Sequence, residues 1–147
     1  MTKYWVFAAN PKIYNIESAV NSVDVDNWTT KNSLIEKGDK VVIWKTLGKE
    51  KKRGILCLGE VLDNPTLQDD LNNPFWINQA NGANKELRVP IRYITNSKLP
   101  IWVGEGYDEI LLDLSVSKSQ GGTVFKLTPT QWENIITIIG DYATIFL

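Results

Sequence analysis

Short runs of β-branched and aromatic residues, each followed by turn residues, recur along this 147-residue sequence. Such runs favour β-strands. Segments with helical apolar spacing lie between them, but without the strict strand–helix alternation that a doubly wound parallel sheet requires. The pattern therefore predicts one α+β domain built around a small barrel of about five strands. The predicted strands cover residues 3–9, 40–45, 54–62, 87–95 and 123–127.

The clearest local signal belongs to the last predicted helix. Thr128 and Gln131 form a capping box, and Pro129 stands at the first helical position. Apolar residues follow at helical spacing, and Gly140 ends the pattern. The sequence therefore predicts a helix that runs to about residue 139. Two shorter helices are predicted at 16–23 and 108–115.

Four other features carry weaker signals. Residues 63–86 are rich in Asn and hold two prolines, so we expect a long irregular connection of the kind that is often functional or mobile. Pro90 is expected to place its strand at an edge or a bulge, and Gly59 marks a bulge or a close backbone approach. The apolar ending, residues 142–147, either packs back as a final strand or was cut from a longer protein.

Histidine is absent, and Cys57 is the only cysteine. Without histidine the chain lacks the commonest general base, the usual partner of a nucleophilic Ser or Cys, and the commonest metal ligand. Cys57 lies in an apolar run and is expected to be a small buried residue. No close-set group of Asp and Glu is visible in the sequence. We therefore expect a binding protein and not an enzyme, with no cofactor and no metal.

Charge limits the possible partners. A net charge of −1 and a pI near 5.5 do not resemble a protein that grips duplex DNA by phosphate neutralisation alone. One basic segment stands out and is either a phosphate-contacting patch or a solvated turn. No apolar run approaches the roughly 20 residues that cross a bilayer, so a cytoplasmic protein without membrane contacts is expected. The basic residues are Lys45, Lys49, Lys51, Lys52 and Arg53.

Trp28 lies in a polar run, DNWTTK, with neither strand-like alternation nor a helical apolar stripe. We therefore predict a loop here. A tryptophan in a loop is either a cap on the core or a flat surface for a planar ligand. Thr29 and Thr30 follow it and offer hydroxyl groups, so an unpaired base stacked on the ring is one interpretation.

Six segments, taken in order at their spacings, carry a family resemblance. They are YWVFAANPKIYNI, DNWTT, IEKGDKVVIW, GILCLGEV, LRVPIRYITNSKLP and GGTVFKLTPTQWENI. With them the chain resembles an EVE domain, a branch of the PUA-like superfamily that also contains the YTH and ASCH domains. The resemblance covers nearly the whole chain. It implies one EVE domain over residues 1–147, with a strongly curved PUA-like β-barrel of about five or six strands flanked by short helices.

The resemblance also implies a pocket for a modified base flipped out of a nucleic acid. In YTH domains a loop tryptophan followed by hydroxyl residues forms one wall of the methyladenine cage, and Trp28, Thr29 and Thr30 match that pattern. The second wall is a strand tryptophan shortly before a Leu-Pro pair. Here Tyr93 holds that place, ahead of Leu99 and the proline that follows it. The tyrosine leaves the identity of the modified base open.

Polar contacts to such a base are implied as well. The first strand of the related domains ends in an asparagine that hydrogen-bonds the base edge, and Asn10 occupies the corresponding place. An Asn side chain donates and accepts, which suits adenine or cytosine. Asp24 and Asp26 are either acceptors for a cytosine amino group or solvated loop charges. Phosphate contacts are expected from the basic segment and from Arg88 and Arg92.

Three functional hypotheses stay open. The first is a reader of modified bases in DNA, such as 5-methylcytosine, 5-hydroxymethylcytosine or N6-methyladenine. The resemblance implies for it a role as the sensing module of a modification-dependent restriction system, in which a fused or separate nuclease or motor effector cuts. The second is an RNA-binding module, in keeping with the wider PUA-like group. The third is a small-molecule-sensing or protein-interaction domain, which the acidic pI favours.

Overall fold

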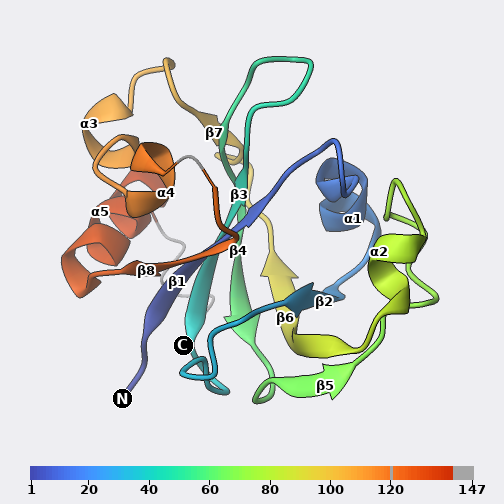
Figure 1. Ribbon diagram of the computed structural model, residues 1–147. Helices are drawn as coiled ribbons and strands as arrows, with labels where there is room; N and C mark the ends of the chain where they lie inside the picture. The colour runs from blue at the N-terminus through green and yellow to red at the C-terminus, as the bar shows by residue number, and fades with distance from the viewer. Residues whose placement is uncertain (120, 141–147) are drawn as a thin grey trace.

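The computed structural model describes residues 1–119 and 121–140, so the apolar ending lies outside the described residues. No helix in this part of the chain is long and apolar enough to span a membrane. Figure 1 shows the strands and helices. In chain order they are β1 Tyr4–Ala9, α1 Ile16–Ser22, β2 Val25–Thr29, β3 Lys40–Lys45, β4 Gly54–Val61, β5 Thr66–Gln68, α2 Ala80–Ala83, β6 Glu86–Ile94, β7 Ile101–Trp102, α3 Asp108–Leu111, α4 Ser115–Lys118, β8 Val124–Leu127 and α5 Pro129–Ile139.

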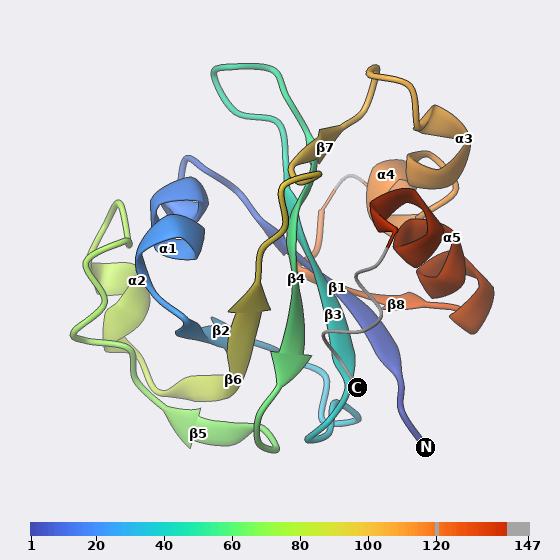
Figure 2. The same ribbon diagram turned by 180° about the vertical axis from the view of Figure 1, so that it is seen from behind.

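All these strands belong to one sheet, whose main path runs β2-β6-β4-β3-β1-β8. Off this path, β5 pairs with β6 and β7 pairs with β4. β1 and β3 are parallel, and the other pairs are antiparallel. The sheet curls into a half-barrel with short helices on both sides (Figures 1 and 2). This confirms the predicted α+β class and the small, curved barrel.

Successive residues of a strand enter two different cores, because both faces of the sheet are covered. Trp5 and Phe7 of β1 belong to the first core, whereas Val6 and Ala8 belong to the second. The first core includes residues of α1, and the second includes residues of α3, α4 and α5. Figures 1 and 2 show these two groups of helices on opposite sides of the sheet. Two covered faces explain why β1, β3 and β4 read as nearly continuous apolar runs.

Helix α5 begins where the sequence predicts it. Thr128 Oγ1 accepts a hydrogen bond from the backbone nitrogen of Gln131 at 3.0 Å, and Gln131 Oε1 accepts from the backbone nitrogen of Thr128 at 3.0 Å. Gly140 follows the last helical residue with a φ of +79°, a conformation that favours glycine. The predicted first helix is confirmed as α1.

The main path of the sheet has six strands, in agreement with the five or six that the resemblance implies, but the sequence pattern missed β2, β5 and β7. Trp28 lies in β2 and not in a loop. The inward positions of β2 are Asp26 and Trp28, and the charge at the first of them hides the alternation. β5 and β7 have three and two residues, too few to show a period.

Two other predictions also need correction. Residues 63–86, predicted to be irregular, contain β5 and α2. The helix predicted at 108–115 is divided into α3 and α4. The division follows from Leu114, whose ψ of 142° is extended backbone that a helix cannot continue.

Pro90 lies inside the sheet, so the prediction of an edge strand is wrong. β6 has β2 on one side and β4 on the other. The carbonyl of Pro90 accepts from the backbone nitrogen of Leu62 at 2.9 Å, so its own nitrogen faces the same neighbour. The last residue pair between β4 and β6 is Val61 with Ile91, which is the residue next to Pro90. The missing N–H of Pro90 therefore falls where the ladder stops.

Gly59 marks a close backbone approach, as predicted. A Cβ at this position would lie 2.6 Å from Cγ2 of Ile91 and 3.2 Å from the carbonyl oxygen of Arg92. The irregularity in the pairing of β3 with β4 lies elsewhere, between Ile43 and Trp44. Glycine is therefore needed here for packing between β4 and β6.

We predict that Gly59→Ala lowers the free energy of unfolding by about 1–3 kcal/mol, because the new methyl group overpacks the first core. Urea denaturation measures the loss. The matched control is Gly121→Ala, where a Cβ meets no heavy atom within 4 Å. We expect the control to stay within about 0.5 kcal/mol of wild type. Equal stability of the two variants would contradict the packing assigned to Gly59.

Candidate functional site

A small cavity lies at the seam of the half-barrel, where the β2 edge of the sheet approaches the end of β1. Its volume is about 130 Å³. We call it the aromatic cavity. None of the described residues that line it is charged. They are Ala8, Ala9, Asn10, Ile13, Tyr14, Asn27, Trp28, Thr29, Trp76 and Thr123.

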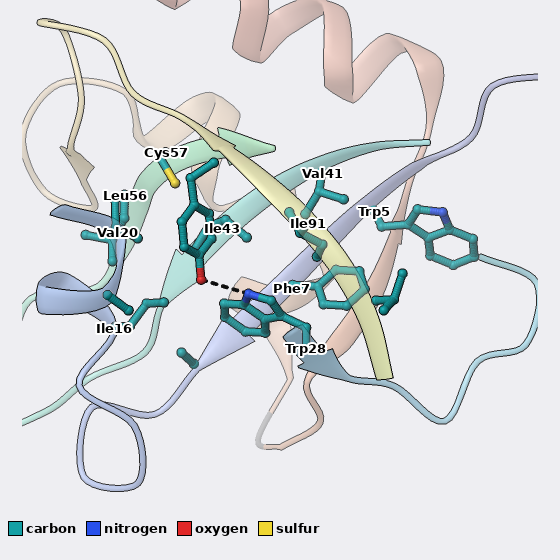
Figure 3. Packing of buried hydrophobic residues seen from close by; sticks show 14 of the residues in the cluster. Trp5, Phe7, Ile16, Val20, Trp28, Val41, Ile43, Leu56, Cys57 and Ile91 are labelled. Atoms are coloured by element: carbon teal, nitrogen blue, oxygen red, sulfur yellow. Dashed lines mark hydrogen bonds between the residues drawn. The ribbon is translucent and has the colours of Figure 1, made fainter. Parts of the chain in front are cut away.

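Three aromatic rings contribute to the wall of this cavity. Trp28 is 9% exposed and meets Phe7 edge to face, with ring centroids 5.7 Å apart (Figure 3). Tyr14 lies 6.3 Å from Trp28 and 4.7 Å from Trp76, again between ring centroids. Tilted and edge-to-face contacts of this kind are favourable for aromatic rings. The segment before α1, strand β2 and the connection between β5 and α2 therefore meet at one aromatic cluster.

Both indoles are anchored by their single N–H donors. Trp28 Nε1 donates to the hydroxyl oxygen of Tyr93 at 2.9 Å, the bond that Figure 3 marks with a dashed line. Trp76 Nε1 donates to Oδ2 of Asp70 at 2.8 Å. An indole has no other hydrogen-bonding group, so each ring is fixed by one polar contact and by packing.

Asp26 is the centre of the polar network behind the rings. The hydroxyl groups of Tyr14 and Tyr93 both donate to its Oδ2 at 2.6 Å. Its Oδ1 accepts from the backbone nitrogen of Asn27 at 3.0 Å and from Nδ2 of Asn73 at 3.3 Å. Four donors therefore converge on one buried carboxyl group, and hydrogen bonds to a carboxylate are among the stronger ones.

Asn73 joins the two halves of this network. Its Nδ2 also donates to the hydroxyl oxygen of Tyr14 at 2.8 Å and to Oδ2 of Asp70 at 2.9 Å. A chain of hydrogen bonds thus runs from Trp28 through Tyr93, Asp26, Asn73 and Asp70 to Trp76. Because the members are buried or half-buried, loss of one would leave others without a partner.

Burial sets the protonation of this network. Desolvation raises the pKa of Asp26 above its ordinary value of 3.8, while the hydrogen bonds from Tyr14 and Tyr93 act in the opposite direction. Desolvation and the nearby Asp26 carboxyl raise the pKa of both tyrosines. Tyr14 and Tyr93 therefore remain neutral donors across the physiological range.

Polar groups line the rim of the cavity. Asn10 is exposed, and its Oδ1 accepts from the backbone nitrogen of Lys12 at 2.9 Å, as in an Asx-turn. Its Nδ2 has no partner among the residues that the structure describes, so it remains available to a ligand. Thr29 Oγ1 accepts from Nη1 of Arg88 at 2.8 Å. The half-buried side chain of Asn27 has no hydrogen bond within the described residues.

Three of the six predicted base-contacting residues line the cavity, namely Trp28, Asn10 and Thr29. Thr30 does not: it is buried, and its Oγ1 closes a turn by accepting from the backbone nitrogen of Asn32. The resemblance identified Trp28 as the aromatic wall. Asn10 could be inferred because it follows the end of β1, and Thr29 because it follows the tryptophan.

Tyr93 and Leu99 do not lie where the cage of two stacked walls would place them. Tyr93 is 7% exposed and meets the edge of Trp28 through its hydroxyl group, so the two rings do not form a sandwich. Tyr93 positions Trp28 instead of lining the cavity. Leu99 packs against the second core, on the side of α3, α4 and α5. Tyr14 and Trp76 supply the other aromatic surfaces.

Two of the predicted phosphate contacts are buried. Lys45 is 3% exposed and lies 3.4 Å from Glu17 and 3.9 Å from Glu50. Arg88 is fully buried and donates to the carbonyls of Gln68 and Asn84 and to Thr29, which ties β2, β5 and the end of α2 together. Neither side chain is free to contact a phosphate at the surface.

The other predicted cations remain accessible in different places. Arg92 is 39% exposed, lies 3.7 Å from Glu60, and points away from the first core that Ile91 and Tyr93 enter. Arg53 is half-buried next to α4. The exposed lysines of the connection between β3 and β4 are Lys49, Lys51 and Lys52.

Sequence reasoning missed most of the polar network. Asp26 is neither a solvated loop charge nor open to a ligand, because it is 7% exposed and its oxygens are occupied by protein donors. Tyr14 and Asn73 were not singled out. The alternation of Asp26 with Trp28 was the available signal for a strand. Within residues 1–119 and 121–140, no group of three or more His, Cys, Asp or Glu side chains is placed to hold a metal ion.

Comparisons with known proteins agree with this fold. The profile of the EVE domain family matches residues 3–138. The human THYN1 protein, solved in complex with DNA containing 5-methylcytosine, superposes with a TM-score of 0.67 at 14% identity, covering 95% of this chain and 99% of that one. A hypothetical protein from Leishmania major has a TM-score of 0.65 at 15% identity, covering 94% of each chain.

The ASCH protein from Zymomonas mobilis is similar at a TM-score of 0.54 and 12% identity, covering 94% of this chain and 96% of that one. No protein of curated function matches the sequence significantly. At these identities the solved structures establish a shared fold. They confirm the PUA-like half-barrel that the sequence resemblance implied.

We predict that Asp26→Asn changes the pH dependence of stability. Because the pKa of Asp26 is raised from 3.8, the folded protein keeps this proton to a higher pH than the unfolded chain does. The stability linked to the protonated group is full below about pH 4 and is lost as the pH rises through the folded-state pKa. Asparagine does not titrate. The unfolding free energy of wild type minus that of the variant should therefore fall as the pH rises from about 4 through the raised pKa of Asp26.

Urea denaturation at a series of pH values measures this difference, and the other carboxyl groups largely cancel because both proteins contain them. A difference that stays constant with pH, or that rises, would contradict the burial of Asp26 as a group that prefers its proton.

Proposed function

The chain belongs to the EVE domain family, and on that premise we propose that it binds a modified base of DNA, of the 5-methylcytosine type, in its aromatic cavity. The base leaves the stack of its strand and enters the cavity beside Trp28. Recognition occurs without catalysis. In a modification-dependent restriction system such a domain would serve as the sensing module, and a fused or separate effector would cut.

One observation carries this proposal: an uncharged cavity of about 130 Å³, bordered by Trp28, Tyr14 and Trp76 and rimmed by amide and hydroxyl groups. An apolar cavity of about 150 Å³ in another protein holds benzene. The aromatic cavity is therefore matched in size to a single six-membered ring. This favours a pyrimidine over the two fused rings of N6-methyladenine.

Stacking and edge contacts divide the work of recognition. Stacking on an aromatic side chain contributes roughly 1–3 kcal/mol for any base, so it gives affinity without selectivity. Selectivity must come from the edge, and the free Nδ2 of Asn10 suits the O2 and N3 acceptors of cytosine. A carboxylate acceptor for the amino group is not available at Asp26, whose oxygens already accept hydrogen bonds.

The methyl group adds a defined increment. Ala8, Ala9 and Ile13 give the cavity apolar lining that a 5-methyl group could contact. Burial of one methyl group is worth about 0.8 kcal/mol, which corresponds to about fourfold in affinity. The complex of human THYN1 with DNA containing 5-methylcytosine supports the choice of this base.

We predict that the protein binds an oligonucleotide with 5-methylcytosine at least about fourfold more tightly than the unmodified sequence. A panel measured by fluorescence anisotropy should include 5-hydroxymethylcytosine, N6-methyladenine and the matching RNA. Equal binding of all oligonucleotides would contradict the proposal. Tighter binding of the RNA would favour an RNA-binding module. Binding of none of them at low salt would favour a small-molecule or protein ligand.

We further predict that Asn10→Asp lowers the affinity for 5-methylcytosine about tenfold. Aspartate lacks the Nδ2 donor, but its carboxylate oxygen can still accept the hydrogen bond from the backbone nitrogen of Lys12. Asn10 is the better test position, since removing the buried ring of Trp28 would itself cost about 3–5 kcal/mol of stability. The matched control is Asn72→Asp, which adds the same charge at an exposed position outside the aromatic cavity. An equal loss in both variants would assign the effect to charge and not to the base edge.

A further inference from the structure

A second hollow, which we call the side groove, adjoins the aromatic cavity. Its volume is about 440 Å³, and it lies between the end of β1, the connection from β3 to β4, and the segment before β8. The two spaces share Ala8, Asn10, Ile13 and Thr123 in their linings. A ligand that fills the cavity can therefore continue into the groove past Asn10.

Arg53 lines the side groove, and among the described residues its guanidinium group makes one hydrogen bond to the protein. Its Nη1 donates to the carbonyl oxygen of Ser117 at 3.2 Å. The other two arginines have carboxylate neighbours: Arg88 lies 3.4 Å from Glu86, and Arg92 lies 3.7 Å from Glu60. Arg53 has no such ion pair among the described residues. Its remaining N–H groups are donors suited to a phosphate.

The charge of the groove lining differs from that of the other hollows. The described lining of the side groove contains Arg53 and no carboxylate. The hollow around Lys45 also contains Glu17 and Glu50, and the hollow beside Asp26 contains further aspartates. Although the chain has a net charge of −1, the lining of the side groove is locally positive and therefore favours an anionic ligand.

Apolar side chains border the same groove. Ile13 is 46% exposed and Leu47 is 54% exposed, although large aliphatic residues are usually buried. Thr46 and Thr123, which carry hydroxyl groups, belong to the same lining. A ligand that matches this lining has an anionic part, an apolar part and hydrogen-bonding groups. A nucleotide has all three, in its phosphate, base face and sugar.

We infer that the side groove holds the nucleotide adjacent in the strand to the base in the aromatic cavity, with Arg53 on its phosphate. The inference rests on the proposed function and extends it, because it specifies the path of the strand over the protein surface. The strand passes from the cavity, over Asn10 and Ile13, towards Arg53. Base recognition and backbone binding then belong to separate residues, Asn10 and Arg53, and separate measurements report them.

The test is Arg53→Gln, with affinities measured for single-stranded oligonucleotides with and without 5-methylcytosine between about 50 and 200 mM salt. Loss of one phosphate contact should weaken both oligonucleotides about tenfold. It should also reduce the steepness of log affinity against log salt by about 0.7 for a single strand. The ratio of affinities for modified and unmodified DNA should not change.

Two further variants make the result specific. Arg92→Gln removes the same charge from a position outside the side groove and should leave affinity and salt dependence near wild type. Arg53→Lys keeps the charge and should restore most of the salt dependence, which assigns that dependence to the charge at this position. Thermal unfolding of each variant shows whether it is folded.

The groove assignment is overturned if Arg53→Gln binds with wild-type affinity and salt dependence, or if Arg92→Gln loses as much. The proposed function is judged from wild type alone. Phosphate dependence at Arg53 without a preference for 5-methylcytosine would support the groove and contradict the base. A preference for 5-methylcytosine without dependence on Arg53 would support the base in the aromatic cavity and contradict the groove. Absence of any oligonucleotide binding by wild type would overturn both.

Discussion

The structure depends on one buried carboxyl group. Asp26 is 7% exposed at the seam of the half-barrel, where an unpaired charge would be costly, and four donors from the protein satisfy it. Two of these donors are the tyrosines that set the cavity geometry: Tyr14 lines the cavity, and Tyr93 fixes the ring of Trp28. Because an unpaired polar group inside a core is costly, the network favours the observed arrangement of the rings. The shape of the binding surface therefore follows from how one carboxyl group is compensated.

This arrangement explains why the cavity is uncharged although carboxyl groups lie close by. Asp26 and Asp70 are directed at protein donors, and the indoles turn their N–H groups towards the network. The ligand-facing surface is left with ring faces, aliphatic groups and the rim amides. Such a surface suits a planar neutral heterocycle, whereas in the proposed complex the charge of the nucleic-acid backbone would lie outside the cavity, at Arg53.

Local signals in the sequence predicted the parts of the fold that depend on neighbouring residues. The capping box at Thr128, the apolar runs of the central strands and the packing of Gly59 all follow from short segments. β2 was missed because the charged residue Asp26 occupies an inward position. Burial of this charged residue is possible only because hydrogen-bond donors from distant segments satisfy its carboxyl group. Tyr14, Asn73 and Tyr93 lie 12, 47 and 67 residues from Asp26 in the sequence, and no periodic pattern connects them. The resemblance identified Trp28, Thr29 and Asn10 by position, but it could not reveal that Arg88 and Lys45 are buried by contacts from distant segments.

The six tryptophans offer a direct view of the central claim, because each indole N–H gives its own signal in a ¹H–¹⁵N spectrum. The decisive measurement is a titration of labelled protein with an oligonucleotide containing 5-methylcytosine. A base in the aromatic cavity should shift the indole signals of Trp28 and Trp76 and the side-chain amide signal of Asn10. The core tryptophans Trp5 and Trp132 should not respond. Saturating DNA that leaves Trp28 and Trp76 unchanged, or that shifts only Trp102, would contradict binding in this cavity.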